Sequence, residues 1–303
     1  MWRIEIARTD DRPKALAMAF SRMPEVDRAA TIQRAMTLLA KGIWTPDGIW
    51  IARDGSRLIG VLIAQPLQGA SCLFWLPIAP HDCADALVSA ALAWCRTRGC
   101  TIAQAFYPPD QSAWTAPFLR NGFRYITRLH HLEYDFSLNT EPKPEFATDL
   151  RLDSCDPNLP TEFGTTLLQT YEDSLDCPEL NGRRSVDEIL AGHRGTGTYH
   201  PDCWWLARRK DVPIGVLIMT EIVNTTTWEL AYVGITPKQR GFGFGRALTL
   251  HALAALRERN AQRLTLAVDA RNRPARRLYE SLGFTETEPL DVVLCFLATT
   301  TPT

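Results

Sequence analysis

Two stretches of the chain share one order of apolar and polar positions. Trp50 to Ile63 and Trp205 to Ile218 each contain an apolar run, a polar turn and a second run rich in branched residues. Paired runs of this kind predict a β-hairpin. The chain therefore carries at least one repeated structural unit.

The similarity continues after each hairpin. Cys72 to Pro80 matches Glu229 to Pro237 as a further strand, and Ala86 to Gly99 matches Ala247 to Asn260 as a helix with apolar residues at helical spacing. The order of elements is thus the same in both halves of the chain.

A last pair of matched segments closes the repeat. Pro117 to Phe123 matches Leu278 to Phe284, and in each a helix is expected to end at a glycine, Gly122 or Gly283. A final strand follows in both copies. Alternating helices and strands of this kind predict an α/β (α+β) fold with a mixed, largely antiparallel sheet flanked by helices.

The length of 303 residues is about twice that of a usual single domain. Between the copies, Asn139 to Glu145 has the proline and charge content of a linker. We therefore predict an N-terminal domain at 1–138, a linker at 139–148 and a C-terminal domain at 149–303.

Composition narrows the possible partners. A net charge of -1 provides no broad basic surface, so nucleic acid is not expected as the main partner. No apolar run approaches the roughly 20 residues of a membrane span, and the N-terminus lacks the features of a secretory signal. We expect a cytoplasmic protein that does not bind a membrane.

Cysteine and histidine positions give no sign of a metal site. The eight cysteines form no CxxC pair, and the six histidines are dispersed without an HExxH pattern. Most cysteines have apolar neighbours, as small buried residues do. We expect no bound metal.

The two copies differ at one chemically informative place. The second copy has Lys238 to Arg246 between its central strand and its helix, with Gly241, Gly243 and Gly245, and the first copy is shorter there. Glycines let backbone N–H groups approach a ligand, and a helix N-terminus favours an anion such as a pyrophosphate. A purely structural turn explains the same glycines, and their spacing matches neither a Rossmann motif nor a P-loop.

Two ordered motifs carry a family resemblance. Arg240-Gly-Phe-Gly-Phe-Gly245 meets the signature [RQ]xxGx[GA], and Asn272 precedes a helix that ends in Leu278-Tyr-Glu-Ser-Leu-Gly-Phe284. The sequence thus resembles the GNAT superfamily of acyl-CoA N-acyltransferases in its tandem, two-domain form. The close resemblance covers about 203–284, with a looser echo in the N-terminal half.

The resemblance implies a sheet splayed between its central strands and acetyl-CoA as the acyl donor. It also implies that Tyr279 acts as the general acid toward the departing thiolate, and that the N–H of Val233 holds the oxyanion. The backbone of Val233 and Ile235 would pair with pantetheine. The remaining residues assigned to the donor site are Gly234, Gln239, Arg240, Gly241, Phe242, Gly243, Phe244, Gly245, Arg246 and Asn272.

Glu229 is the candidate general base, because a carboxylate beside the central strand can accept a proton from an amine. A solvated glutamate at a strand end is the alternative, and Glu221 is a weaker substitute for the role. In the first copy Cys72 stands in place of Glu229 and Phe118 in place of Tyr279. The N-terminal half is therefore predicted to be non-catalytic, although an acyl-CoA held there in a different manner stays open.

The acceptor region is expected at about 156–201. Tyr171 to Glu179 carries four acids, which suit a cationic acceptor, and a solvated acidic loop accounts for them equally well. Ser185 to Glu188 has the pattern of a capping box. His193 to His200 fits either a lid or a long connection, and nothing in the sequence names the acceptor or the acyl length.

The function expected from these features is acetyl transfer from acetyl-CoA to a primary amine by direct attack in a ternary complex. One alternative is a non-catalytic acyl-CoA-binding regulatory module, and a second is a nucleotide-binding domain, against which the glycine spacing argues. Two fused copies can replace the dimer that a single-copy relative would form, which favours a monomer.

Overall fold

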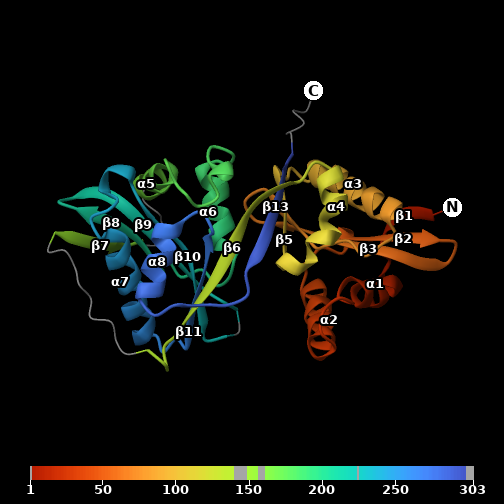
Figure 1. Ribbon diagram of the computed structural model, residues 1–303, viewed down its shortest axis with the longest axis horizontal. Coiled ribbons are helices and arrows are strands. Elements are labelled where there is room, and N and C mark those ends of the chain that lie inside the picture. Colours follow the sequence, from red (N-terminus) through yellow and green to blue (C-terminus); the bar gives the residue numbers. More distant parts are fainter. Residues whose placement is uncertain (1, 140–148, 156–160, 224, 298–303) are drawn as a thin grey trace. The chain divides into compact units, whose positions relative to one another are not determined.

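The computed structural model describes residues 2–139, 149–155, 161–223 and 225–297. The chain forms two compact units (Figure 1). The first unit comprises Met1–Ile126 and Leu290–Thr303, and the second comprises Thr127–Pro289. Each unit has its own mixed sheet with helices packed against it, as the order of elements predicted.

The first unit has a sheet in the order β1-β2-β3-β4-β5-β13, with every pair antiparallel except β4 and β5. Its elements are β1 (Trp2–Ile6), α1 (Arg12–Ala19), α2 (Glu25–Ala40), β2 (Ile49–Asp54), β3 (Arg57–Leu67), β4 (Ser71–Phe74), α3 (His81–Thr97), β5 (Ile102–Tyr107), α4 (Ala116–Arg120) and β13 (Leu290–Phe296).

The second unit has a sheet in the order β7-β8-β9-β10-β11-β6, with only β10 and β11 parallel, and β12 pairs with β6. Its elements are β6 (Arg124–Asp135), β7 (Leu150–Ser154), α5 (Thr161–Tyr171), α6 (Val186–Arg194), β8 (Trp204–Arg209), β9 (Val212–Glu221), β10 (Thr227–Ile235), α7 (Phe244–Glu258), β11 (Arg263–Asp269), α8 (Arg273–Ser281) and β12 (Thr285–Glu286).

The units and the sequence repeats have different ends. Strand β6 ends the first copy in the sequence, yet it pairs with β11 over Leu129 to Asp135. Strand β13 ends the second copy and pairs with β5 over Asp291 to Phe296. Each copy thus supplies the last strand of the other unit's sheet. The predicted linker is outside the described residues except for Asn139, so the boundary at 139–148 stays a prediction about the repeat.

The local predictions hold with small shifts in their bounds. Both hairpins are present as β2–β3 and β8–β9. The capping box is also confirmed, because the Ser185 hydroxyl accepts a hydrogen bond from the Glu188 N–H while the Glu188 carboxylate accepts one from the Ser185 N–H. Gly122 and Gly283 follow their helices with φ of +88° and +94°. Helices α3 and α7 begin earlier than predicted, at His81 and Phe244.

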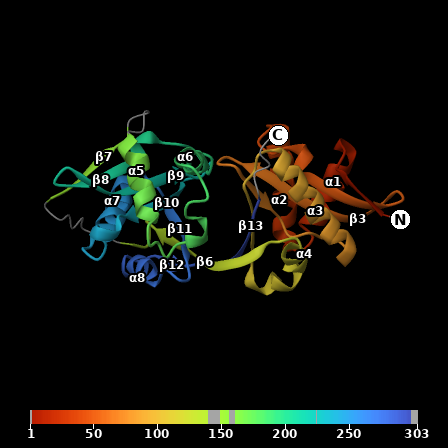
Figure 2. The same ribbon diagram turned by 90° about the horizontal axis from the view of Figure 1, so that it is seen from above.

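Side chains in the second unit alternate between two cores, as expected for strands buried on both faces. Trp205 and Leu217 lie in a core with α7 and α8, whereas their neighbours Trp204 and Val216 lie in a core with α5. Helices α7 and α8 therefore cover one face of the sheet, and α5 and α6 cover the other (Figure 2).

The parallel strands β10 and β11 are paired over only part of their length. They pair only from Thr227 to Glu229 on β10, opposite Arg263 to Thr265 on β11. Beyond this point β10 continues to Ile235 and β11 continues to Asp269 without pairing to each other. An irregularity in the β9 register between Leu230 and Tyr232 coincides with the parting. The splay that the family resemblance implied is thus present.

Within the described residues, no helix combines the length and the apolar character that crossing a bilayer requires.

The exchange of final strands predicts which unit loses stability when a residue of β13 is made smaller. Val293 of β13 is fully buried in the core formed by α3, β4 and β5. We expect Val293→Ala to cost about 1–2 kcal/mol, because it removes buried methyl groups and leaves a cavity. Hydrogen exchange should then accelerate in β5 and α3 while β10 keeps its protection.

Val268→Ala is the matched control, because Val268 is equally buried but belongs to the core of the second unit. It should accelerate exchange in β10 and β11 and spare β5. Loss of protection in β10 alone after Val293→Ala would contradict this assignment of β13.

Candidate active site

The backbone of β10 faces the opening between the parted strands. The N–H of Thr236 donates to the carbonyl of Ile214 on β9 at 2.8 Å. Because residues on an antiparallel pair alternate between bonded and non-bonded positions, the N–H and C=O groups of Val233 and Ile235 point away from β9. These are the backbone groups that were predicted to meet pantetheine, and at Val233 they face the side where β11 has departed.

Glycines shape the turn between β10 and α7. Gly241 and Gly243 have φ of +83° and +84°, a region that side chains disfavour. Gly243 is the N-cap of α7 and no side chain caps this end. The N–H of Ala247 is the first to find an acceptor within the helix, the carbonyl of Gly243 at 3.1 Å. The preceding N–H groups are left for an anion, as at other helix N-termini.

Arg240 holds the turn in place. Its Nε donates to the carbonyl of Ile235 at 3.0 Å. Its two Nη atoms donate to the carbonyls of Thr170, Glu172 and Asp173 at 2.9, 2.7 and 3.0 Å. These carbonyls end α5, where a cation is favourable. Arg240, the arginine of the signature, therefore holds the turn against the C-terminal end of α5 through its hydrogen bonds.

The other predicted side chains around the turn point in several directions. Gln239 accepts a hydrogen bond from Arg209 at 3.5 Å, and Arg246 donates to the Ser281 hydroxyl on α8 at 3.0 Å. Phe244 is buried in the core, whereas Phe242 is 66% exposed. For Phe244, only the backbone is placed to meet a ligand.

Gly234 lets β10 approach α5 closely. A Cβ at this position would lie 2.6 Å from both the Thr170 hydroxyl and the Tyr232 hydroxyl. These two hydroxyls are hydrogen-bonded at 2.8 Å, and the Thr170 hydroxyl also donates to the Leu167 carbonyl at 2.6 Å. Tyr232 is therefore the donor to Thr170, and the arrangement fixes β10 against α5.

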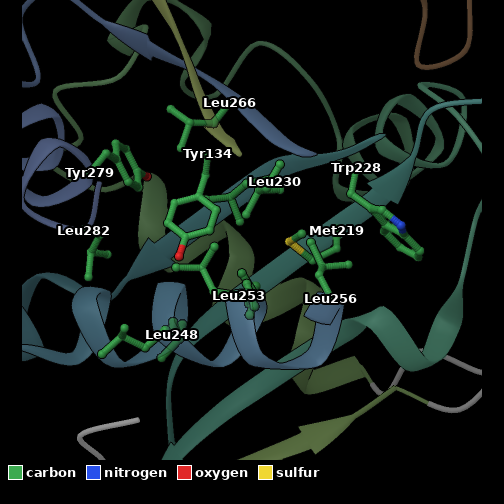
Figure 3. Close-up of a cluster of buried hydrophobic side chains, with 14 of the residues drawn as sticks. Tyr134, Met219, Trp228, Leu230, Leu248, Leu253, Leu256, Leu266, Tyr279 and Leu282 are labelled. Carbon is green, nitrogen blue, oxygen red and sulfur yellow. The ribbon is translucent and has the colours of Figure 1, made fainter. Parts of the chain in front are cut away.

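Tyr279 projects from α8 into the second unit. Asn272 caps this helix, since its side-chain oxygen accepts a hydrogen bond from the Ala275 N–H at 3.3 Å. Figure 3 shows the Tyr279 ring within the buried cluster that includes Leu230 and Leu266. Its hydroxyl makes no hydrogen bond within the described residues. Burial, followed by the nearby charge of Asp176, raises the pKa of the Tyr279 hydroxyl, so it is a proton donor at neutral pH.

Glu229 lies on β10 at the last pair before the strands part. It is opposite Thr220 on β9 and Thr265 on β11. Burial raises the pKa of the Glu229 carboxyl, which brings it closer to the range of a useful base. The hydroxyl of Thr220 is buried without a hydrogen-bond partner in the described part of the chain. Strand pairing places Thr220 opposite Glu229, and the sequence did not single Thr220 out.

A buried acidic pair lies at the end of β11. Asp269 accepts hydrogen bonds from Thr127 at 2.7 Å, from the Cys177 N–H at 3.0 Å and from Arg271 at 2.7 Å. Burial opposes ionisation of Asp269, but these bonds outweigh it and lower its pKa. Asp176 accepts the Asp269 N–H at 3.2 Å. Burial, with the charge of Asp269, raises the pKa of Asp176 to about 6.

Asp176, Cys177 and Asp269 are also the one group in the described residues with enough ligand atoms close together for a metal ion. The oxygens of Asp269 already accept hydrogen bonds from Thr127 and Arg271. Arg271 supplies the positive charge that a cation would bring. The contacts of Asp269 in this group are therefore those of a salt bridge with Arg271.

A cavity of about 220 Å³ opens on the face of the sheet that α5 and α6 cover. Ala231 of β10 and Ala267 of β11 contribute to one side of it. Tyr171, Asp176, Arg184 and His193 contribute from α5, α6 and the segment between them. This segment lies in the predicted acceptor region, but neither Asp176 nor Arg184 was singled out from the sequence.

The corresponding part of the first unit is filled. Strand β4 is paired with β5 along its whole length, from Ser71 to Phe74. Phe118, in the place of Tyr279, is fully buried, with its ring centroid 6.1 Å from that of Phe74 and 4.7 Å from that of Phe123. The splay and the phenol of the second unit thus have no equivalent at these positions.

Known proteins match this part of the chain. Residues 164–284 match the Acetyltransferase (GNAT) family. The resemblance carried by the two sequence motifs is therefore confirmed over these residues of the second unit.

The curated relatives are mycothiol acetyltransferases. The protein of that name from Thermobispora bispora is 35% identical over 149 residues, which cover 48% of this chain and 49% of the relative. The one from Acidothermus cellulolyticus is 54% identical over 56 residues, which cover 18% of this chain and 17% of the relative. The matched part of the chain thus spans about half the length of the first of these relatives and a smaller share of the second.

Solved structures share the fold over nearly the whole chain. A GCN5-related N-acetyltransferase from Sphaerobacter thermophilus has a TM-score of 0.66 at 15% identity and covers 99% of this chain and 98% of its own. A tandem GNAT protein from the clavulanic acid biosynthesis pathway has a TM-score of 0.57 at 15% identity and covers 98% of both chains. The predicted tandem fold is confirmed by these similarities.

The raised pKa of Asp176 predicts a pH dependence of stability. Because the folded-state pKa of about 6 exceeds the usual 3.8, the folded protein keeps a proton that the unfolded chain loses. This contribution to stability falls as the pH rises from about 4 to 6. Asp176→Asn removes it, so the variant should gain stability relative to the parent across that window.

Denaturant unfolding of both proteins at several pH values measures the difference. A difference that does not change between pH 4 and pH 7 would show that Asp176 has an ordinary pKa. Asp173→Asn serves as the control, because Asp173 is exposed and shows no such burial.

Proposed function

We propose that this protein is an N-acetyltransferase that moves an acetyl group from acetyl-CoA to a primary amine. The observation that carries the proposal is the combination of two features in one unit. An uncapped helix N-terminus at Gly243 lies at the end of a strand whose backbone, at Val233, faces an open gap. Pyrophosphate and pantetheine require these two features respectively.

The proposed reaction is a direct transfer. The amine nitrogen attacks the thioester carbonyl carbon and gives up a proton, directly or through water, to Glu229. The N–H of Val233 donates to the oxyanion that forms. The carbon–sulfur bond then breaks, and Tyr279 gives its proton to the leaving thiolate, so that an amide and free CoA result.

The state of each group suits its proposed role. Tyr279 is protonated at neutral pH and its hydroxyl is not committed to another residue in the described chain. Glu229 is half-buried, and its raised pKa makes it a stronger base than a solvated glutamate. The relatives are named for an acetyl transfer, which supports the reaction class; the acceptor in their name is one candidate for an acceptor screen.

Binding of the donor is the first test. We expect calorimetry to find one acetyl-CoA site per chain and no binding by a Gly243→Glu, Gly245→Glu double variant, because carboxylates at the helix N-terminus repel pyrophosphate. Gly42→Glu is a control, since Gly42 also has positive φ and open space around it but belongs to the first unit.

Two sites in the parent protein would mean that the first unit binds acetyl-CoA as well. Absence of any binding would overturn the proposed function.

Turnover separates the enzyme from a binding module. We expect amine-dependent CoA release to fall roughly 10²- to 10⁴-fold in Tyr279→Phe, with acetyl-CoA affinity retained, because only the transferable proton is removed. Glu229→Gln in the same assay should lower the rate and remove the acid limb of the pH profile. Steady CoA release by Tyr279→Phe at the parent rate would exclude it as the acid.

Tyr134→Phe is the matched control for the tyrosine. Tyr134 is buried in the same core as Tyr279 and lies on β6 (Figure 3). Its substitution should leave the rate within about twofold. Tight acetyl-CoA binding without turnover across many amines would favour the regulatory binding module.

A further inference from the structure

The cavity beside the parted strands is lined by Ala231 of β10 and Ala267 of β11 on one side and by residues of α6 on another. Ala231 and Ala267 have small side chains, so the strand end of the cavity has room for an acceptor. Arg184 and His193 lie in its lining on the α6 side. A volume of about 220 Å³ admits a small molecule of amino-acid size.

Arg184 is the one cation in the described lining of this cavity. Its Nε is buried and has no hydrogen-bond partner within the described residues. The Arg184 side chain as a whole is half-buried, and a buried donor that bonds nothing is unfavourable, because it has lost water without gaining an acceptor. The site is thus incomplete without a group that accepts hydrogen bonds.

Three of the acids close to Arg184 in the sequence are engaged elsewhere. Glu179 accepts two hydrogen bonds from Arg271, at 2.6 and 3.0 Å. Glu188 accepts the Ser185 N–H at 2.7 Å in the capping box. Asp176 accepts the Asp269 N–H. None of these carboxylates forms a salt bridge with Arg184.

Two titratable groups of the same cavity, His193 and Tyr171, are uncharged at neutral pH. Burial, followed by the charge of Arg184, lowers the pKa of His193 to about 4. Burial raises the pKa of Tyr171 to about 12. Arg184 therefore supplies the one positive charge of the described lining, and Asp176, whose carboxyl has a pKa of about 6, is the acid of the same lining.

We propose that Arg184 binds an anionic group of the acceptor, so that the acceptor is an amine that also carries a carboxylate, such as an amino acid or a short peptide. This inference rests on the proposed acetyl transfer. A guanidinium binds a carboxylate through two parallel hydrogen bonds. These bonds fix the orientation of the carboxylate, and the positive charge of the guanidinium compensates its negative charge. The amine of the same molecule then reaches the thioester from the strand end of the cavity.

Matched acceptors test the proposal. CoA release is measured with an amino acid and with its carboxamide, which has the same side chain and amine but no carboxylate. We expect the acid to have a kcat/KM about 10- to 100-fold higher, the range of a hydrogen bond to a charged group. In Arg184→Gln this preference should vanish, mainly through a higher KM for the acid.

Arg183→Gln is the matched control, because Arg183 is the exposed neighbour of Arg184 and does not line the cavity. It should keep the preference. Retained acetyl-CoA affinity in Arg184→Gln shows that the variant is folded, and Arg184→Lys, which keeps the charge without the two-pronged geometry, should show an intermediate preference.

Equal rates for acid and carboxamide in the parent protein, or an undiminished preference in Arg184→Gln, would overturn the proposal. Faster turnover of phosphate-bearing amines would overturn the choice of carboxylate. If no amine is acetylated, the proposed function fails first. Calorimetry with an N-acetylated amino acid and its carboxamide then still tests Arg184, since product binding needs no turnover.

Discussion

Beyond Glu229, strand β10 has a hydrogen-bonding neighbour on one edge only, because β11 departs from it. Unpaired backbone groups in a sheet interior are unfavourable unless a ligand or water meets them. The rest of the second unit is arranged around this opening. The turn at Gly241 to Gly243 lies at one end of β10, Glu229 marks the other, and Tyr279 enters the same unit from α8.

Holding β10 in place without β11 requires other contacts. Arg240 ties the turn to three carbonyls at the end of α5, and the hydroxyls of Thr170 and Tyr232 join α5 to β10. Gly234 permits this close approach. Helix α5 thus replaces β11 as the support of β10, which leaves one edge of the strand free. The first unit keeps β4 and β5 paired and fills the space with Phe118.

The last strand of each sequence copy belongs to the sheet of the other unit. Strand β13 completes the sheet of the first unit although it follows the second copy in the sequence, and β6 completes the second. Each unit therefore depends on a strand that the other copy encodes. The first copy, which lacks the glycine turn, thus still supplies strand β6 to the sheet of the second unit.

The sequence by itself determined the elements, the repeat and the glycine turn that we propose as part of the donor site, because glycine spacing, strand alternation and helix capping are local properties of neighbouring residues. It placed Tyr279, the turn from Gln239 to Arg246 and the capping box at Ser185. Only the tertiary structure decided which sheet receives β6 and β13, since a strand pattern does not name the strand that it pairs with. It also decided that Arg240 supports the turn and that Arg184 lines a cavity, with its Nε unbonded within the described residues. Those facts depend on which partners folding brings near each charge, and residues far apart in the chain supply them.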